Sequence, residues 1–272
     1  MIRETRKVDG ILPEDLKRFD RVHPGHVGCN TVHTTRVKVA NWILTDGYHR
    51  VLDVPAGTGA LSCMLLAHGI DVVSADLCPE AFLVSGKPCI RADLNERLPF
   101  DDGTFDAVAC IEGIEHIENP HLLAREANRI LRPGGKIYIS TPNILSIRSR
   151  LSILFRGYPN QFHYMMELDP TTGREQPIAH INPIGLLELR YVLSRWGFRM
   201  DRLEANRQVK KWSWLSQALR AVLLTRGRRS AAVHSRIAAV RAALLSDAVL
   251  FGEGLMVSAT KETDWRAGAF LK

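Results

Sequence analysis

Short apolar runs alternate with helical patterns in the first half of the chain. Four runs are rich in β-branched residues, as expected for strands buried on both faces: 49–54, 70–76, 105–111 and 136–141. The segments 61–68 and 121–131 lie between them and have helical spacing, and the second ends at Arg-Pro-Gly-Gly. This alternation predicts an α/β fold with a parallel sheet covered on both sides, whose ligands bind beyond the carboxyl ends of the strands.

Upstream of the first strand, residues 32–44 predict another helix. Val32, Val39, Trp42 and Ile43 form one apolar stripe on it. The chain shows no repeats and no low-complexity linker, so we expect a single domain over residues 1–272. Within it we expect an N-terminal helical cap at 1–48 and a helical insertion at 205–249.

A glycine loop follows the first strand in the sequence VLDVPAGTGAL, residues 51–61. A dinucleotide-binding loop needs three glycines so that its backbone can approach a pyrophosphate. Only Gly57 and Gly59 are present, and Pro55 and Ser62 replace the first and third glycines. Asp53 would repel a phosphate but would suit an ammonium or sulfonium group. The loop therefore favours a cationic ligand.

The loop resembles the first motif of class I S-adenosylmethionine (SAM)-dependent methyltransferases, V-L-D-x-G-x-G-x-G. The later motifs follow in that family's order and spacing: RADLN (91–95), LPFDDGTFDAV (98–108), EGIEHIENP (112–120) and LRPGGKIYISTPN (131–143). The resemblance implies a Rossmann-like, mostly parallel sheet of seven strands in the order 3-2-1-4-5-7-6, with helices on both faces. It also implies a helix at 184–198, an antiparallel last strand at 250–261 and a basic helical insertion before that strand.

The resemblance also implies which residues bind SAM. Asp76 stands where the family binds the ribose hydroxyls, and Asp93 faces the adenine amino group with Leu94 beside the ring. Arg36 matches an arginine that pairs with the SAM carboxylate in ubiquinone O-methyltransferases. The alternatives are structural: the two aspartates would cap loops, and Arg36 would be a solvated surface residue. The full implied set is Arg36, Asp53, Ala56, Gly57, Gly59, Asp76, Leu77, Asp93, Leu94 and Glu112.

The EGIEH segment carries candidate catalytic chemistry. Glu112, Glu115 and His116 would project to one side if a helical turn began at Glu112. Similar motifs in ubiquinone and small-RNA methyltransferases hold a divalent cation together with a later histidine, here His180. These four residues could hold Mg²⁺, Mn²⁺ or Zn²⁺. Alternatively, His116 is a metal-free general base assisted by Glu112, or the motif only shapes the pocket.

Segments after the fifth strand are expected to enclose the methyl acceptor. Tyr158, His163, Tyr164, Met165 and Met166 could line its site or form core under a long loop. Our first expectation for the acceptor is a sugar hydroxyl of a cell-surface or lipid-linked glycan, as in similar glycan-pathway methyltransferases. The second is a phenolic or quinone precursor. A non-catalytic SAM-binding module and a nicotinamide-dependent oxidoreductase remain as alternatives.

Positive charge is concentrated late in the chain, whose formal net charge is +7. Residues 205–246 contain nine Arg and Lys residues and no Asp or Glu. Trp214, Leu215, Ala218, Leu219 and Val222 fit one helical stripe, and Ile237, Val240 and Leu244 fit another. A basic amphipathic helix pair suits an anionic membrane surface or an anionic lipid-linked substrate, and the alternative is a hairpin packed on the sheet.

The same composition excludes other classes of protein. No aromatic stacking platform accompanies the basic residues, so we do not expect nucleic acid as a partner. Five scattered cysteines without C-x-x-C spacing suit buried thiols in a reducing compartment. No run is apolar enough to span a membrane and the first residues lack a signal core, so we expect a cytoplasmic protein, with peripheral membrane attachment as an option.

Overall fold

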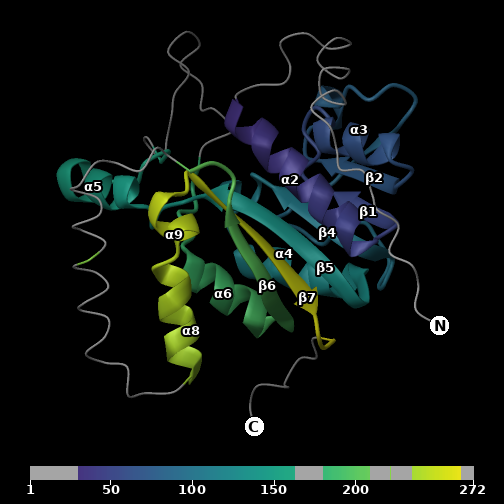
Figure 1. Cartoon of the computed structure of the whole chain (residues 1–272). Coiled ribbons are helices and arrows are strands. Elements are labelled where there is room, and N and C mark those ends of the chain that lie inside the picture. Colours follow the sequence, from purple (N-terminus) through teal and green to yellow (C-terminus); the bar gives the residue numbers. More distant parts are fainter. Residues whose placement is uncertain (1–29, 163–179, 209–220, 222–234, 265–272) are drawn as a thin grey trace, which may run out of the picture.

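The computed structural model describes residues 30–162, 180–208, 221 and 235–264. A seven-stranded sheet with the order β3-β2-β1-β4-β5-β7-β6 forms its centre (Figure 1). The strands are β1 (Arg50–Asp53), β2 (Asp71–Asp76), β3 (Cys89–Arg91), β4 (Phe105–Ile111), β5 (Leu131–Pro142), β6 (Phe198–Ala205) and β7 (Gly254–Lys261). This order confirms the predicted topology.

The first five strands pair in parallel, and β7 pairs antiparallel with both β5 and β6. The described α-helices are α2 (Asn30–Asp46), α3 (Ala60–Ala67), α4 (Pro120–Ile130), α5 (Ile147–Arg156), α6 (Leu186–Arg195), α8 (Ser235–Leu244) and α9 (Asp247–Phe251). Two short 3₁₀ turns are η1 (Pro79–Ala81) and η2 (Ile114–His116). The four strands and the helices predicted over 32–44, 61–68 and 121–131 all occur, with ends shifted by a few residues.

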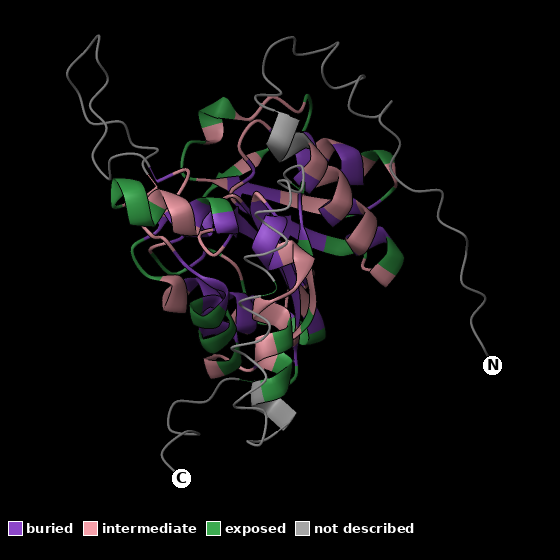
Figure 2. Ribbon diagram, turned by 60° about the vertical axis from the view of Figure 1, so that its left-hand side comes forward, coloured by how far each residue is buried: buried purple, intermediate pink, exposed green. Residues whose placement is uncertain are grey.

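Two apolar cores lie on opposite faces of the sheet. Successive residues of a strand point to opposite faces, so Val108 of β4 belongs to the core under α4 and α6, while Ala107 and Ala109 belong to the core under α2 and α3. Figure 2 shows the buried sheet between more exposed helices. Val39 and Ile43 of α2 are fully buried, as predicted, and Trp42 packs against the same core.

A carboxylate at the end of α2 fastens this helix to the sheet. Asp46 accepts hydrogen bonds from Tyr138 Oη at 2.7 Å and Lys136 Nζ at 3.1 Å, both on β5. Arg202 of β6 donates to both of its oxygens, at 2.6 and 3.0 Å. Burial alone would raise the pKa of Asp46, but these donors outweigh burial and lower it.

Replacing Asp46 by Ala is expected to reduce the free energy of unfolding by about 3 kcal/mol, because it leaves partly buried cations without their partner. The folded pKa is depressed, so the wild-type advantage is present above the unfolded pKa of about 3.9 and is lost as the pH falls below it. Urea unfolding of the wild type and the variant at several pH values measures this difference in the free energy of unfolding. The matched control is Asp71→Ala, which breaks an exposed pair with Arg50 and should cost under about 1 kcal/mol.

The insertion before the last strand differs in part from the prediction. The strand expected over 250–261 begins at Gly254, because the residues before it form α9, which Ser246 caps by accepting a hydrogen bond from Val249 N. Asn143 donates to the carbonyl oxygens of Val249 and Gly252 at 2.9 Å and so closes the end of α9. Among the described helices, none is long and apolar enough to cross a membrane.

Leu244 of α8 packs against the apolar cluster of Leu186, Val249 and Leu255. The second stripe of the insertion is therefore anchored on the core at this end. The first stripe, from Trp214 to Val222, lies outside the described residues, as do the cap residues 1–29.

Candidate active site

The glycine loop leads from the carboxyl end of β1 into α3 and contacts the carboxyl end of β2. Gly57 and Gly59 have φ angles of 54° and 91°, which glycine adopts readily. Asp76, the last residue of β2, accepts hydrogen bonds from Gly57 N and Cys78 N, both at 2.8 Å. Its carboxylate therefore shapes the loop and stands at the edge where parallel sheets bind ligands.

The two loop glycines have different surroundings. A Cβ on Gly57 would meet no atom within 4 Å, so its backbone borders open space that a ligand could approach. A Cβ on Gly59 would lie 2.5 Å from Val84 Cγ2 and 2.6 Å from Phe82 Cε2. Gly59 thus makes room for the chain after β2, a packing role that the sequence did not reveal.

Asp53 is more enclosed than the sequence suggested. Only 1% of it is exposed, and Ser62 Oγ donates to its Oδ2 at 2.6 Å. Burial raises the pKa of Asp53 to about 6, although the Ser62 bond and the charge of Arg36 oppose the rise. Ser62, at the position of the missing glycine, therefore binds the carboxylate that the sequence led us to expect beside a cationic ligand. Burial raises the pKa of Glu112 as well, and the charge of Arg36 opposes this rise, so α2 brings its guanidinium close to both acids.

Pro55 links the glycine loop to the loop after β4. A Cβ on Gly113 would lie 2.5 Å from Pro55 Cδ, so the proline ring occupies the space that Gly113 leaves. The departure from the family's glycine at Pro55 is thus matched by a glycine on the neighbouring loop. This contact holds the two loops together above the carboxyl ends of β1 and β4.

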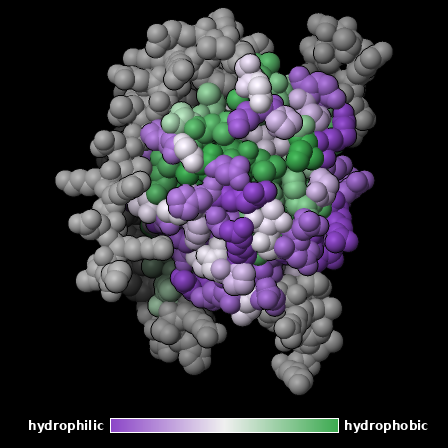
Figure 3. Space-filling model, turned by 90° about the vertical axis from the view of Figure 1, so that its right-hand side faces the viewer, coloured by the Kyte–Doolittle hydropathy of each residue, from purple (hydrophilic) through white to green (hydrophobic). Residues whose placement is uncertain are grey.

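The residues expected to meet adenine and ribose lie along the β2–β3 edge. Leu77 is 50% exposed, whereas Leu94 is buried. Asp93 is half-buried, and its Oδ1 accepts a hydrogen bond from Asn95 N at 2.7 Å. Figure 3, viewed from the side of α3 and β2, shows apolar surface bordered by hydrophilic residues. Together with the open space at Gly57, these residues fit a cofactor with an apolar ring and a polar chain.

Two acidic side chains meet beyond β4. Glu112 has a φ of 53°, and it exchanges two hydrogen bonds with Ser140: Glu112 N donates to Oγ at 3.0 Å, and Oγ donates to Oε1 at 2.6 Å. The predicted helical turn therefore does not begin at Glu112; a 3₁₀ turn begins at Ile114. Burial raises the pKa of Glu112, and burial together with the Glu112 charge raises the pKa of Glu115 well above its usual range.

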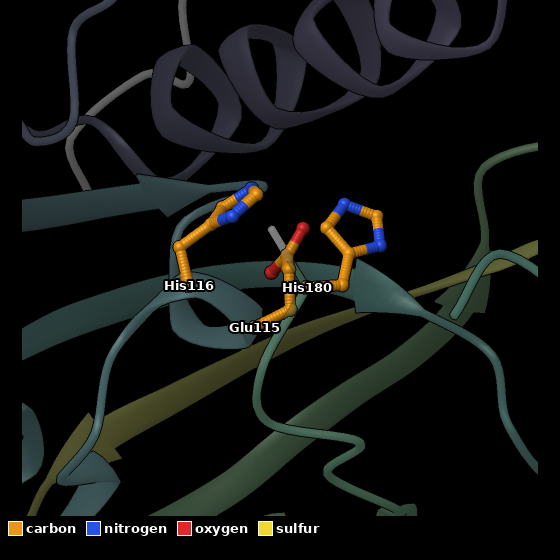
Figure 4. A group of neighbouring side chains, drawn as sticks. All are labelled: Glu115, His116 and His180. Carbon is orange, nitrogen blue, oxygen red and sulfur yellow. The ribbon is translucent and has the colours of Figure 1, made fainter. Parts of the chain in front are cut away.

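Glu115, His116 and His180 form a compact cluster, in which the Glu115 carboxylate lies between the two imidazoles (Figure 4). One potential ligand atom from each residue lies within 4.8 Å of the others. Glu115 is fully buried, and among the described residues neither of its oxygens has a hydrogen-bond partner. Buried carboxylates without partners are costly, so a proton or a cation between these groups would stabilise them. Glu112, expected as a fourth ligand, is not part of this group.

Backbone contacts bring His180 to the cluster from far along the chain. Ile181 N and Asn182 N both donate to the Glu115 carbonyl oxygen, at 2.9 and 3.0 Å. His180 Nδ1 lies 2.8 Å from the carbonyl oxygen of Gln161. A carbonyl only accepts, so Nδ1 carries a proton and, in the neutral ring, Nε2 keeps its lone pair for a proton or a metal.

Nothing in the sequence indicated the contacts that Ser62, Gly113, Ser140 and Gln161 make in the site. The departures from the loop motif at Pro55 and Ser62 were visible, but their partners were not. Tyr158 is half-buried, and the rest of the expected acceptor wall, from His163 to Met166, lies outside the described residues.

The strand order, the glycine loop and the acidic residue that ends β2 define a class I SAM-dependent methyltransferase architecture. Residues 52–139 match the family model described as a methyltransferase domain. Over 90% of its length the chain also superposes on a SAM-dependent methyltransferase from Archaeoglobus fulgidus, covering 99% of that chain with a TM-score of 0.55 and 19% identity. This likeness shows the shared fold.

Two curated relatives are similar in sequence over part of their length. A ubiquinone biosynthesis O-methyltransferase from Xanthomonas oryzae pv. oryzae is 37% identical over 40% of this chain and 49% of its own length. A demethylmenaquinone methyltransferase from Clavibacter sepedonicus is 34% identical over 52% of this chain and 61% of its own length. The match spans about half the length of these relatives.

Proposed function

We propose that this chain is a SAM-dependent O-methyltransferase whose acceptor is a phenolic or quinone-type small molecule. The observation that carries the proposal is the cluster of two imidazoles and a buried carboxylate beside the glycine loop. Such a cluster suits removal of a proton from a hydroxyl group. The names of the curated relatives support a quinone-type acceptor over the sugar hydroxyl that was our first expectation.

In this mechanism the acceptor oxygen attacks the methyl carbon in line with the C–S bond. A new C–O bond forms as the C–S bond breaks, and the electron pair of the C–S bond remains on sulfur. SAM supplies an already activated methyl group, so alignment of the two reactants contributes much of the rate. Asp76 and Asp93 orient the adenosine, and Arg36 pairs with the carboxylate of the methionine moiety. His116 accepts the acceptor's proton, and Glu115 stabilises the resulting imidazolium.

The same cluster fits a divalent cation. One carboxylate and two imidazoles are ligands typical of Zn²⁺ and Mn²⁺, and less so of Mg²⁺, which prefers oxygen. The unpartnered oxygens of Glu115 and the fixed tautomer of His180 are the features that favour it. A bound cation would lower the pKa of an acceptor hydroxyl. Glu115, His116 and His180 would hold it, and the acceptor or water would complete the coordination.

A labelled-methyl assay tests the proposal. With methyl-labelled SAM, we expect label in catechol- and hydroquinone-type acceptors and none in a glycolipid extract. Loss of turnover in EDTA and recovery with Mn²⁺ or Zn²⁺ would assign the cluster to a metal, whereas unchanged turnover would leave His116 as the base.

Other outcomes distinguish the alternatives. Label in the glycolipid extract would restore the sugar acceptor. SAM binding by titration calorimetry without transfer to any acceptor would favour a non-catalytic module. NADH binding without SAM affinity would overturn the methyltransferase proposal.

A further inference from the structure

The second half of α5 protrudes from the molecule. Its first half is anchored, because Ile147 and Leu151 pack against Leu250 and Phe251 of α9. The last turn is different: Ile153, Leu154 and Phe155 are 44%, 73% and 79% exposed. Leu154 and Phe155 are the most exposed large apolar side chains in the described part of the chain. The helix lies at the outer left of Figure 1.

The exposed turn is not a groove or a flat patch. Consecutive helical residues point in different directions, about 100° apart, yet four in a row, residues 153–156, are exposed. Side chains on several sides of the last turn of α5 are thus exposed to solvent. A rigid partner surface would need a matching hollow, whereas the apolar interior of a bilayer can surround such an end.

Basic side chains accompany these apolar residues. Arg148 and Arg156 are exposed on the same helix, and Arg150 is half-buried. From Ala127 to Met166 the sequence contains no Asp or Glu. Basic residues near an anionic membrane contribute about 1 kcal/mol each, and this attraction adds to the insertion of apolar side chains.

From these observations we infer that the exposed end of α5 docks the protein on the surface of an anionic membrane. Leu154 and Phe155 enter the outer acyl region while Arg148 and Arg156 contact lipid phosphates. This assigns membrane contact to α5 instead of the basic segment 205–246. Binding is measured without turnover, so the inference does not rest on the proposed methyl transfer.

The location also suits a lipid-borne acceptor. Gln161, whose carbonyl oxygen binds His180, follows the end of α5 by five residues. Five residues span at most about 18 Å. The end of α5 and the backbone group that binds His180 therefore lie no further apart than this.

Vesicle sedimentation of the full chain tests the inference. The protein should sediment at low salt with vesicles of phosphatidylglycerol and phosphatidylcholine, and not with phosphatidylcholine alone. The double variant Leu154→Glu, Phe155→Glu should need about tenfold more lipid for half-maximal binding. Replacing Arg148 and Arg156 by Ala should reduce the dependence on lipid charge. The matched control, Leu187→Glu with Tyr191→Glu, alters exposed apolar residues of α6 and should bind like the wild type.

Three results would overturn the inference. Wild-type protein that ignores anionic vesicles has no such docking site. A Leu154/Phe155 double variant that binds as well as wild type places the contact elsewhere, as in the basic segment. A double variant that changes the oligomeric state or lowers the thermal unfolding midpoint shows that a second copy or another segment of this chain covers α5 in solution.

Discussion

Asp76→Ala is expected to weaken binding of S-adenosylhomocysteine about a hundredfold while the protein remains folded. The substitution removes an anion expected to accept the ribose hydroxyls, and hydrogen bonds to charged groups contribute about 1.5–3 kcal/mol each. It also removes the acceptor for Gly57 N and Cys78 N, so the loop loses its fixed shape. About 2.7 kcal/mol corresponds to a hundredfold change in affinity. Titration calorimetry measures the change directly.

The control for this variant lies on the same strand. Asp71 begins β2 at the opposite end of the sheet, and Asp71→Ala should leave the affinity unchanged. Asp76→Asn separates the two roles, because its amide oxygen can still accept one backbone bond but carries no charge. Retained affinity in Asp76→Ala would remove Asp76 from the ribose site.

His116→Ala is expected to reduce turnover by about 10²- to 10⁴-fold, the usual contribution of a positioned base, with little change in SAM affinity. Residual activity should remain, because alignment of acceptor and methyl does not depend on the imidazole. Single-turnover transfer of labelled methyl measures the chemical step. His49→Ala is the matched control, since His49 is exposed and lies just before β1, away from the carboxyl ends of the strands.

The variant His180→Ala, alone and combined with His116→Ala, tests whether the two histidines of the cluster act as a unit. If His116 and His180 serve one function, the double variant should lose little more activity than either single variant, because removing members of a catalytic unit is not additive. Full activity in His116→Ala would contradict its role as base. It would leave the cluster with a structural function.

Local patterns predicted a large part of this fold. Runs of β-branched residues marked β1, β2, β4 and β5, because strands buried on both faces need apolar side chains at successive positions. The glycine loop was recognisable because a tight turn at a sheet edge restricts which residues fit, whereas Asp76 was assigned through the family resemblance. The helical spacing of α2 likewise predicted the burial of Val39 and Ile43.

Other features depend on residues that are far apart in the chain. The helical turn expected at Glu112 is replaced by a bond to Ser140, which lies 28 residues later on β5. Asp53 is buried, and its carboxylate accepts a hydrogen bond from Ser62 of α3. Neither pairing has a periodic signal, since it depends on which strands become neighbours.

By itself, the sequence determined the order of the elements, the buried faces of the strands and the residue types at their carboxyl ends. The family resemblance grouped His180 with Glu115 and His116, but only the tertiary structure revealed the backbone bonds, across more than sixty residues, that bring it there. It also decided that the apolar residues Ile153, Leu154 and Phe155 at the end of α5 are exposed. The physical reason is that periodicity reports which side chains avoid water, whereas contacts between distant segments depend on the path of the whole chain.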